Sequence, residues 1–155
     1  MLAVELTPAT ASGYVRLAFD QMLAVADRLG DQRVNVRPIG PDTNSVAALV
    51  IHGCGVSEFW LGHVGLGRES RRDRDSEFSS TATLAELHSR VGSSLRQVDA
   101  DLAALDAGAE SPYAEWRKFL KVDSESDASL ALHVIEELFQ HLGHCEIAAD
   151  ALLTP

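Results

Sequence analysis

Hydrophobic residues recur along the chain at the three- and four-residue spacing of amphipathic helices, not at the alternate spacing of strands. Four long segments show this helical spacing, over residues 8–29, 45–66, 84–107 and 128–153. A shorter helix is expected over 113–120. The apolar face of the first segment consists of Ala11, Val15, Ala18, Met22, Val25 and Leu29. Because strand signals are nearly absent, the pattern predicts an all-α protein.

Capping residues stand where these segments should begin and end. Thr7 can cap the first helix, Pro8 suits its first position, and Gly30 can end it. Thr83 followed three residues later by Glu86 predicts a capping box for the third helix. For the other two helices several residues can act as the cap, namely Thr43, Asn44 or Ser45 for the second and Ser126 or Asp127 for the fourth.

Four helices of similar length can bury their apolar faces only against one another, which predicts a four-helix bundle. We expect one domain over residues 1–155. The linkers 30–44 and 108–127 are long, so the helices need not follow a simple up-down-up-down order. The loop 68–80 is rich in charges of both signs, and we expect its arginines, Arg68, Arg71, Arg72 and Arg74, to be solvated. The alternative is that these arginines meet the anionic parts of a small-molecule ligand.

Composition and charge exclude several classes of function. Hydrophobic residues make up 46% of the chain, which is enough for a core. The net charge of −10 opposes binding to nucleic acid, and no apolar run is long enough to span a membrane. The N-terminus lacks the features of a signal peptide, and two cysteines do not form a disulfide framework. We therefore expect a cytoplasmic protein with reduced thiols.

Two ionisable residues of the last helix fall on its apolar face. A helix turns by about 100° per residue, so the apolar positions 130, 134, 148 and 152 lie within roughly 20° of His141. Glu137 lies one turn earlier and about 40° away, also on the buried side. A buried charge is costly unless it is paired or binds a metal, so this pair requires an explanation.

The second helix offers a matching imidazole. His52 is central on its apolar face, within about 40° of Val56 and Phe59. His52, Glu137 and His141 would form a set of three metal ligands that leaves a coordination position open, as in catalytic sites. The alternative is a core histidine and a glutamate that pairs with a buried arginine. The metal site is favoured because the pattern occurs on two helices, with no Lys or Arg on the Glu137 face.

Other metal-binding residue types have simpler explanations. His144 lies about 60° from His141, as a possible neighbour of the ligands or an alternative ligand. Cys145 follows His141 by one turn but is expected to be a small buried residue, and Cys54 points away from His52. Surface or edge positions are expected for the remaining histidines, His63, His88 and His133.

Two segments resemble the DinB/YfiT-like superfamily of metal-binding four-helix bundles. The first is residues 44–52, with Phe59 and Trp60 downstream. The second is residues 132–144, which contain His133, the doublet Glu136-Glu137, and the run His141-Leu142-Gly143-His144. They are similar to the branch that includes mycothiol-dependent maleylpyruvate isomerase and mycothiol S-transferases. Gly53 and Gly55 depart from this pattern, since better helix formers are usual there, and a locally loose helix is expected.

The resemblance implies a function and a ligand set. His52, Glu137 and His141 match the divalent-metal ligands of the family, usually zinc and sometimes nickel, and relatives are often homodimers. The sequence ends at Pro155 without the additional domain of the isomerase, which favours an S-transferase that joins a small thiol such as mycothiol to small electrophiles. His144 could then orient a ligand or move a proton. The alternatives are a metal-dependent hydrolase and a non-catalytic, stress-related dimeric bundle.

Overall fold

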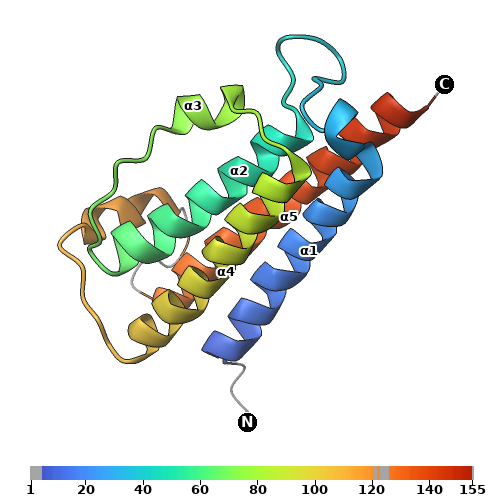
Figure 1. Ribbon diagram of the computed structural model, residues 1–155. Coiled ribbons are helices and arrows are strands. Elements are labelled where there is room, and N and C mark those ends of the chain that lie inside the picture. Colours follow the sequence, from blue (N-terminus) through green and yellow to red (C-terminus); the bar gives the residue numbers. More distant parts are fainter. Residues whose placement is uncertain (1–4, 121, 123–125, 155) are drawn as a thin grey trace.

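The computed structural model of the chain describes residues 5–120, 122 and 126–154, and consists of helices joined by loops (Figure 1). The longest helices are α1 (Pro8–Arg33), α4 (Leu84–Asp106) and α5 (Asp127–Leu153). α2 (Val46–Ser57) continues into the π-helix η1 (Glu58–Gly65). Two short elements, α3 (Arg74–Ser79) and the 3₁₀ helix η2 (Ala114–Leu120), lie in the connections. The described residues contain no strand, which confirms the all-α fold class.

The helices begin at the expected caps. The side chains of Thr7, Ser45 and Ser126 each accept a hydrogen bond from a backbone N–H of the first turn. Thr83 and Glu86 form the predicted capping box, in which each side chain accepts from the other residue's backbone N–H. Helical geometry also breaks at Gly30, whose φ of 69° is in the left-handed region, although one further turn extends α1 to Arg33.

The long helices do not alternate in direction along the sequence. α1 and α5 run one way and α2 and α4 run the other (Figure 1). Hydrogen bonds at one end of the bundle agree with this arrangement. Asp31, near the end of α1, accepts from the backbone N–H of Leu84 at the start of α4, and Arg33 donates to the carbonyl of Leu152 at the end of α5. The connection 66–83, which contains α3, makes this order possible, because it runs from the end of η1 back to the start of α4 (Figure 1). The linkers after α1 and after α4 instead join neighbouring helix ends.

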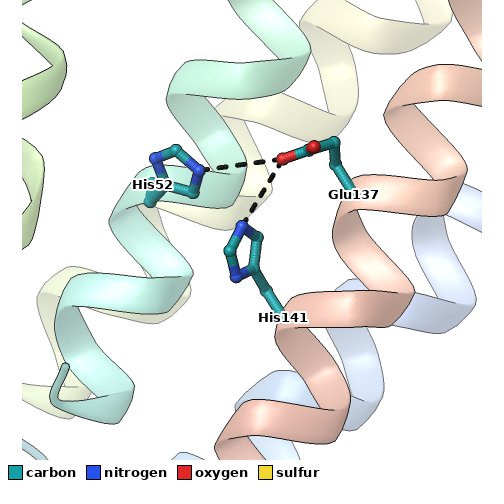
Figure 2. Close-up of side chains that lie close together, drawn as sticks. All are labelled: His52, Glu137 and His141. Carbon is teal, nitrogen blue, oxygen red and sulfur yellow. Dashed lines mark ion pairs between the residues drawn. The ribbon is translucent and has the colours of Figure 1, made fainter. Parts of the chain in front are cut away.

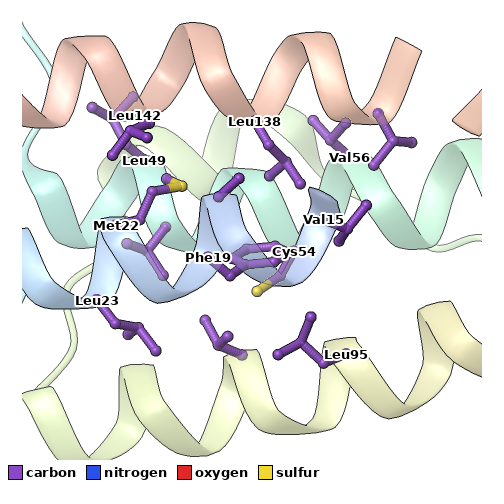
Figure 3. Packing of buried hydrophobic residues seen from close by; sticks show 14 of the residues in the cluster. Val15, Phe19, Met22, Leu23, Leu49, Cys54, Val56, Leu95, Leu138 and Leu142 are labelled. Carbon is purple, nitrogen blue, oxygen red and sulfur yellow. The ribbon is translucent and has the colours of Figure 1, made fainter. Parts of the chain in front are cut away.

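The core lies between the four long helices and is lined by their apolar faces (Figure 3). Phe19 and Met22 of α1, Leu49 of α2 and Leu138 of α5 are almost fully buried. Such burial of large side chains stabilises each by about 1.5–3 kcal/mol relative to exposure. Among the described residues, no helix combines the length and apolarity that crossing a membrane requires.

The two glycines of α2 allow close packing instead of loosening the helix. α2 is continuous through Gly53 and Gly55, so the expectation of a loose segment is wrong. A Cβ atom at Gly53 would lie 2.8 Å from Cδ2 of Leu138, which shows how closely α5 approaches α2 here. This close approach brings the buried faces of α2 and α5, and the ionisable residues on them, next to each other.

Candidate metal centre

α2 and α5 place three side chains around one point (Figure 2). His52 of α2 is 2% exposed, and its Nε2 atom lies 4.0 Å from Oε2 of Glu137 on α5. Nε2 of His141, one turn later on α5, lies 3.5 Å from the same oxygen. The two imidazole rings meet edge to face, with 4.7 Å between their centroids. The helical spacing of the sequence therefore brings all three residues together.

The chemistry and spacing of these side chains fit a divalent cation. One atom from each residue can be chosen such that all three lie within 4.8 Å of one another. Around a tetrahedral zinc with bonds of about 2.0–2.1 Å, ligand atoms are about 3.4 Å apart. The His141–Glu137 distance already matches this value, and the His52–Glu137 distance needs to shorten by about half an ångström. Two imidazoles and one carboxylate are also a donor set that zinc accepts.

A second carboxylate fixes the ring of His52 from the opposite side. Nδ1 of His52 lies 2.8 Å from Oε2 of Glu77, which comes from α3. Because an ionised carboxylate only accepts hydrogen bonds, Nδ1 carries the proton and donates it. The lone pair is therefore on Nε2, the atom that faces Glu137. A carboxylate that holds a ligating histidine in this way is common in metal centres, where it fixes the tautomer and the ring orientation.

Arg72 holds Glu77 in place with two hydrogen bonds. Its Nε donates to Oε1 over 2.6 Å and its Nη2 to Oε2 over 2.8 Å. Both side chains are largely buried, at 16% and 10% exposure. Burial acts to raise the pKa of Glu77, but the hydrogen bonds from Arg72 and His52 outweigh it, and the net pKa is lowered. Glu77 is therefore a carboxylate, as the orientation of His52 requires.

The electrostatic environment also favours the protonation states that a metal needs. Burial lowers the pKa of His52 by more than the hydrogen bond with Glu77 raises it, so the imidazole is neutral near pH 7. A hydrogen bond from His141 lowers the pKa of Glu137 against the opposing effect of burial. The site therefore offers a neutral imidazole on α2 and an ionised carboxylate on α5. The buried Nδ1 of His141 has no hydrogen-bond partner among the described residues.

The expectation of solvated arginines in the loop 68–80 is wrong for Arg72, which is largely buried and pairs with Glu77. Arg68 is exposed as expected, but it pairs with the buried carboxylate of Asp101 on α4. These pairs fold the loop onto the bundle, and part of it forms α3. Arg71 is solvated as expected, with a side chain that is 88% exposed.

Sequence reasoning missed Glu77 because it lies in the mostly polar segment 68–80 and no helical period links it to His52. The signal that could have revealed it is Gly55. A Cβ atom there would overlap Oε1 of Glu77, so only a glycine lets this carboxylate reach the helix surface. A glycine inside a helical pattern indicates a close approach of this kind.

A cavity of about 590 Å³ opens beside the cluster. His52 and Glu137 line it together with Arg72, Arg74, His133 and aromatic residues from η1 and η2. Its aromatic residues are Phe59, Trp60, Trp116 and Phe119. The volume lies in the range of small-molecule sites, so a ligand of modest size can reach His52 and Glu137.

The remaining candidates lie outside the immediate cluster. His144 is exposed, and its ring centroid lies 5.6 Å from that of His141. It lines a separate hollow next to Pro38 and Ile39, not the cavity beside His52. Cys145 and Cys54 are fully buried, as expected for small core residues, and burial raises the pKa of each thiol to about 12.

Two further histidines contact aromatic residues of η1 or of the segment just before η2. His63 stacks on Tyr113 with 4.1 Å between ring centroids, and His133 meets Trp60 edge to face. His133 also belongs to a second group with suitable spacing for an ion, which consists of His133, Glu136 and Glu137. This group contains one imidazole and the exposed Glu136, and it shares Glu137 with the first cluster. His52 and His141 belong only to the first cluster, and His133 and Glu136 belong only to the second. Mutations at these positions can therefore distinguish the two clusters.

Comparisons with known proteins identify a relationship over nearly the whole chain. A family model described as Mycothiol-S-transferase (MST) matches residues 10–152. The matched region includes α2, all but the last residue of α5, and all three residues of the cluster. Searches of curated proteins and of solved structures found no match.

Proposed function

The chain belongs to the mycothiol-S-transferase family, and we propose that it joins a small thiol of the mycothiol type to an electrophilic small molecule at a divalent metal centre. The ligands in this proposal are His52, Glu137 and His141, and the metal is zinc, with nickel as the alternative. The observation that carries the proposal is the convergence of these three side chains, with ligand atoms within 4.8 Å, beside a cavity of small-molecule size.

The state of the chain's own thiols supports a separate thiol substrate. Thiolates are the reactive form of cysteine, and a thiol with a pKa near 12 forms almost none at neutral pH. Cys54 and Cys145 are 0% exposed, and both have a pKa raised to about 12 by burial. Neither can act as the nucleophile of a transfer reaction, so a thiol that reacts in the cavity has to come from a bound small molecule.

The residues around the cluster have distinct tasks in this proposal. A divalent cation held by His52, Glu137 and His141 would lower the pKa of a coordinating thiol and would so supply a thiolate at neutral pH. Glu77 keeps the Nε2 lone pair of His52 directed at the cluster, and Arg72 keeps Glu77 ionised. In the transfer itself, sulfur forms a bond to the electrophilic carbon, the leaving group departs with the electron pair of its broken bond, and the thiol proton passes to solvent.

Several finer features stay predictions. A proton-transfer role for His144 would have to act through His141, because His144 does not line the cavity. The homodimer that the resemblance implies and the cytoplasmic location expected from the composition are also part of the proposal.

The proposal is tested with zinc-loaded protein without a His tag, mycothiol and a chromogenic electrophile such as chlorodinitrobenzene. We expect thiol-dependent product formation that falls at least about 100-fold in His52→Ala. His88→Ala is the matched control, because His88 is a half-exposed histidine paired with Asp27 on the surface. This variant should retain the activity of the wild type.

Hydrolysis is distinguished in the same experiment by a chromogenic ester. Ester cleavage without any thiol, at a rate that mycothiol does not change, would replace the transferase by a metal-dependent hydrolase. Equal activities of wild type, His52→Ala and His88→Ala would remove the metal cluster from the reaction. A zinc-loaded protein that catalyses neither reaction with a panel of thiols and electrophiles would leave a non-catalytic bundle.

A further inference from the structure

We propose that the cavity beside the cluster binds an aromatic electrophile that carries an anionic group, with the ring against η1 and η2 and the anion at Arg74. This inference rests on the proposed function and specifies the class of its second substrate. It is carried by two independent features of the cavity, its aromatic side chains and its distribution of charge.

Aromatic side chains from two elements meet at the cavity. Phe59 of η1 meets Trp60 and Trp116 edge to face, at centroid distances of 5.5 and 5.4 Å. Trp116 and Phe119 of η2 are 5.5 Å apart, and they are 39% and 53% exposed. Aromatic rings associate at centroid distances of about 4.5–7 Å, edge to face or offset. The cavity therefore presents ring faces and edges at the spacing at which a planar aromatic molecule would contact several of them.

The exposure of Trp116 and Phe119 indicates that a ligand could cover them. Large aromatic side chains that stay in contact with water lose the stabilisation that burial would provide. Both residues line the cavity, and an aromatic ligand would cover them. A polar or aliphatic ligand would cover them too, but it would gain less from contact with the rings.

The charges at the cavity favour an anion. Its lining contains two arginines and one carboxylate, that of Glu137, which belongs to the cluster. Glu77 neutralises Arg72 through two hydrogen bonds. Arg74 makes no ion pair with any residue that the structure describes, and its guanidinium lies 5.1 Å from the ring centroid of Phe78. In a chain with a net charge of −10, an arginine without a carboxylate partner at a cavity is a natural site for an anionic group.

The position of the tryptophans provides a direct test of binding. The sequence contains two tryptophans, and both line this cavity. Quenching of tryptophan fluorescence therefore reports on this site. The probe is para-nitrobenzoate, a quencher with a ring and a carboxylate. Its neutral analogue is para-nitrobenzyl alcohol. Its non-aromatic analogue is cyclohexanecarboxylate, whose binding is measured by competition with para-nitrobenzoate.

We expect para-nitrobenzoate to bind about tenfold more tightly than either analogue. Arg74→Gln should remove the preference for the carboxylate, and Trp116→Leu should reduce the preference for the ring. Arg71→Gln and Tyr14→Leu are matched controls at exposed positions outside the cavity, and neither should alter the affinities. Equal affinity for all three compounds, or equal effects of Arg74→Gln and Arg71→Gln, would overturn the inference.

The same titrations in metal-free protein separate this inference from the proposed function. If zinc-free protein and Glu137→Gln bind para-nitrobenzoate with the Arg74 dependence intact, the ligand class is supported even where thiol transfer fails. If thiol transfer proceeds but neutral aliphatic electrophiles are used as well as anionic aromatic ones, the ligand class is wrong and the transferase stands.

Discussion

The carboxylate of Glu77 lies 2.8 Å from Nδ1 of His52, on the side of the ring away from Glu137. This contact determines which nitrogen of His52 holds the proton, and so which nitrogen faces the cluster. Residues 25 positions apart in sequence are thereby joined through a helix, α3, that folds over α2.

If Glu77 positions His52, its replacement should weaken zinc binding without removing a ligand. We expect Glu77→Gln to lower the zinc affinity about 10- to 100-fold, because the amide no longer ensures the Nδ1 proton and no longer neutralises Arg72. Competition with a chromogenic chelator measures the affinity. Glu58→Gln is the matched control, since Glu58 is a half-buried glutamate that pairs with Arg90 in the same region. A Glu77→Gln variant that binds zinc as tightly as Glu58→Gln would contradict the positioning role.

Gly55 should be as important as the carboxylate that it accommodates. Gly55→Ala places a methyl group against Oε1 of Glu77, and we expect it to destabilise the protein by about 1–3 kcal/mol and to weaken zinc binding. Gly13→Ala in α1 is the control, because a Cβ atom there meets nothing within 4 Å. It should stabilise the helix by about 0.5–1 kcal/mol. Urea denaturation measures both effects, and equal stabilisation by the two substitutions would refute the close-approach argument.

The helical periodicity of the sequence was sufficient to predict the long helices and the residues on their buried faces. The positions of His52, Glu137 and His141 follow from 3.6 residues per turn, because each helix buries one face and the ionisable residues on it have to share the interior. The caps at Thr7 and Thr83 were predicted because capping depends on residues close in sequence.

Features that depend on distant contacts were not predicted. The charges of 68–80 have the composition of a solvated loop, and most of them are exposed. The burial of Glu77 and Arg72 depends on Glu77 meeting His52, and the loop is also held by Arg68, which pairs with the buried Asp101. The change from α-helix to π-helix at Glu58 has no signal in the hydrophobic pattern. Such features are set by packing between elements, which outweighs local preference.

The two cysteines should be inert in the folded protein. A soluble disulfide reagent should label Cys54 and Cys145 slowly in buffer and rapidly in urea, because both thiols are buried and have a raised pKa of about 12. A variant with both cysteines replaced by alanine should retain thiol transfer if it folds, as judged by circular dichroism. Loss of transfer in a folded double variant would show that the chain supplies its own nucleophile.

The same thiols should make the protein sensitive to alkali. Unfolded cysteines release their protons near the ordinary pKa of 9.0, whereas the folded ones keep them up to about 12. The unfolded state therefore binds fewer protons between these values, and the free energy of unfolding should fall as pH rises above about 9. Urea denaturation at several pH values should show a smaller alkaline loss in the double alanine variant; an equal loss would rule the cysteines out as its cause.

In acid, the metal-free protein should lose stability through His52. In the unfolded state His52 takes up a proton near its ordinary pKa of 6.5. In the folded state its pKa is lowered, so it takes up the proton only at a lower pH. The free energy of unfolding should therefore decrease as pH falls below 6.5. Urea denaturation in the presence of a chelator should show this fall of the unfolding free energy with pH in the wild type and in His88→Gln. The dependence on pH should be weaker in His52→Gln. Identical slopes in all three would exclude His52 as the source.

The stoichiometry of zinc binding tests the central claim most directly. Equilibrium dialysis of untagged protein, followed by elemental analysis, compares wild type with Glu137→Gln, His141→Ala and Glu136→Gln. Glu136→Gln is the adjacent control, and it also probes the second group of His133, Glu136 and Glu137. We predict one zinc per chain in wild type and Glu136→Gln, and a large loss in Glu137→Gln and His141→Ala. A wild type that binds well below one ion per chain, or zinc that is lost with Glu136→Gln but kept with His141→Ala, would contradict the account.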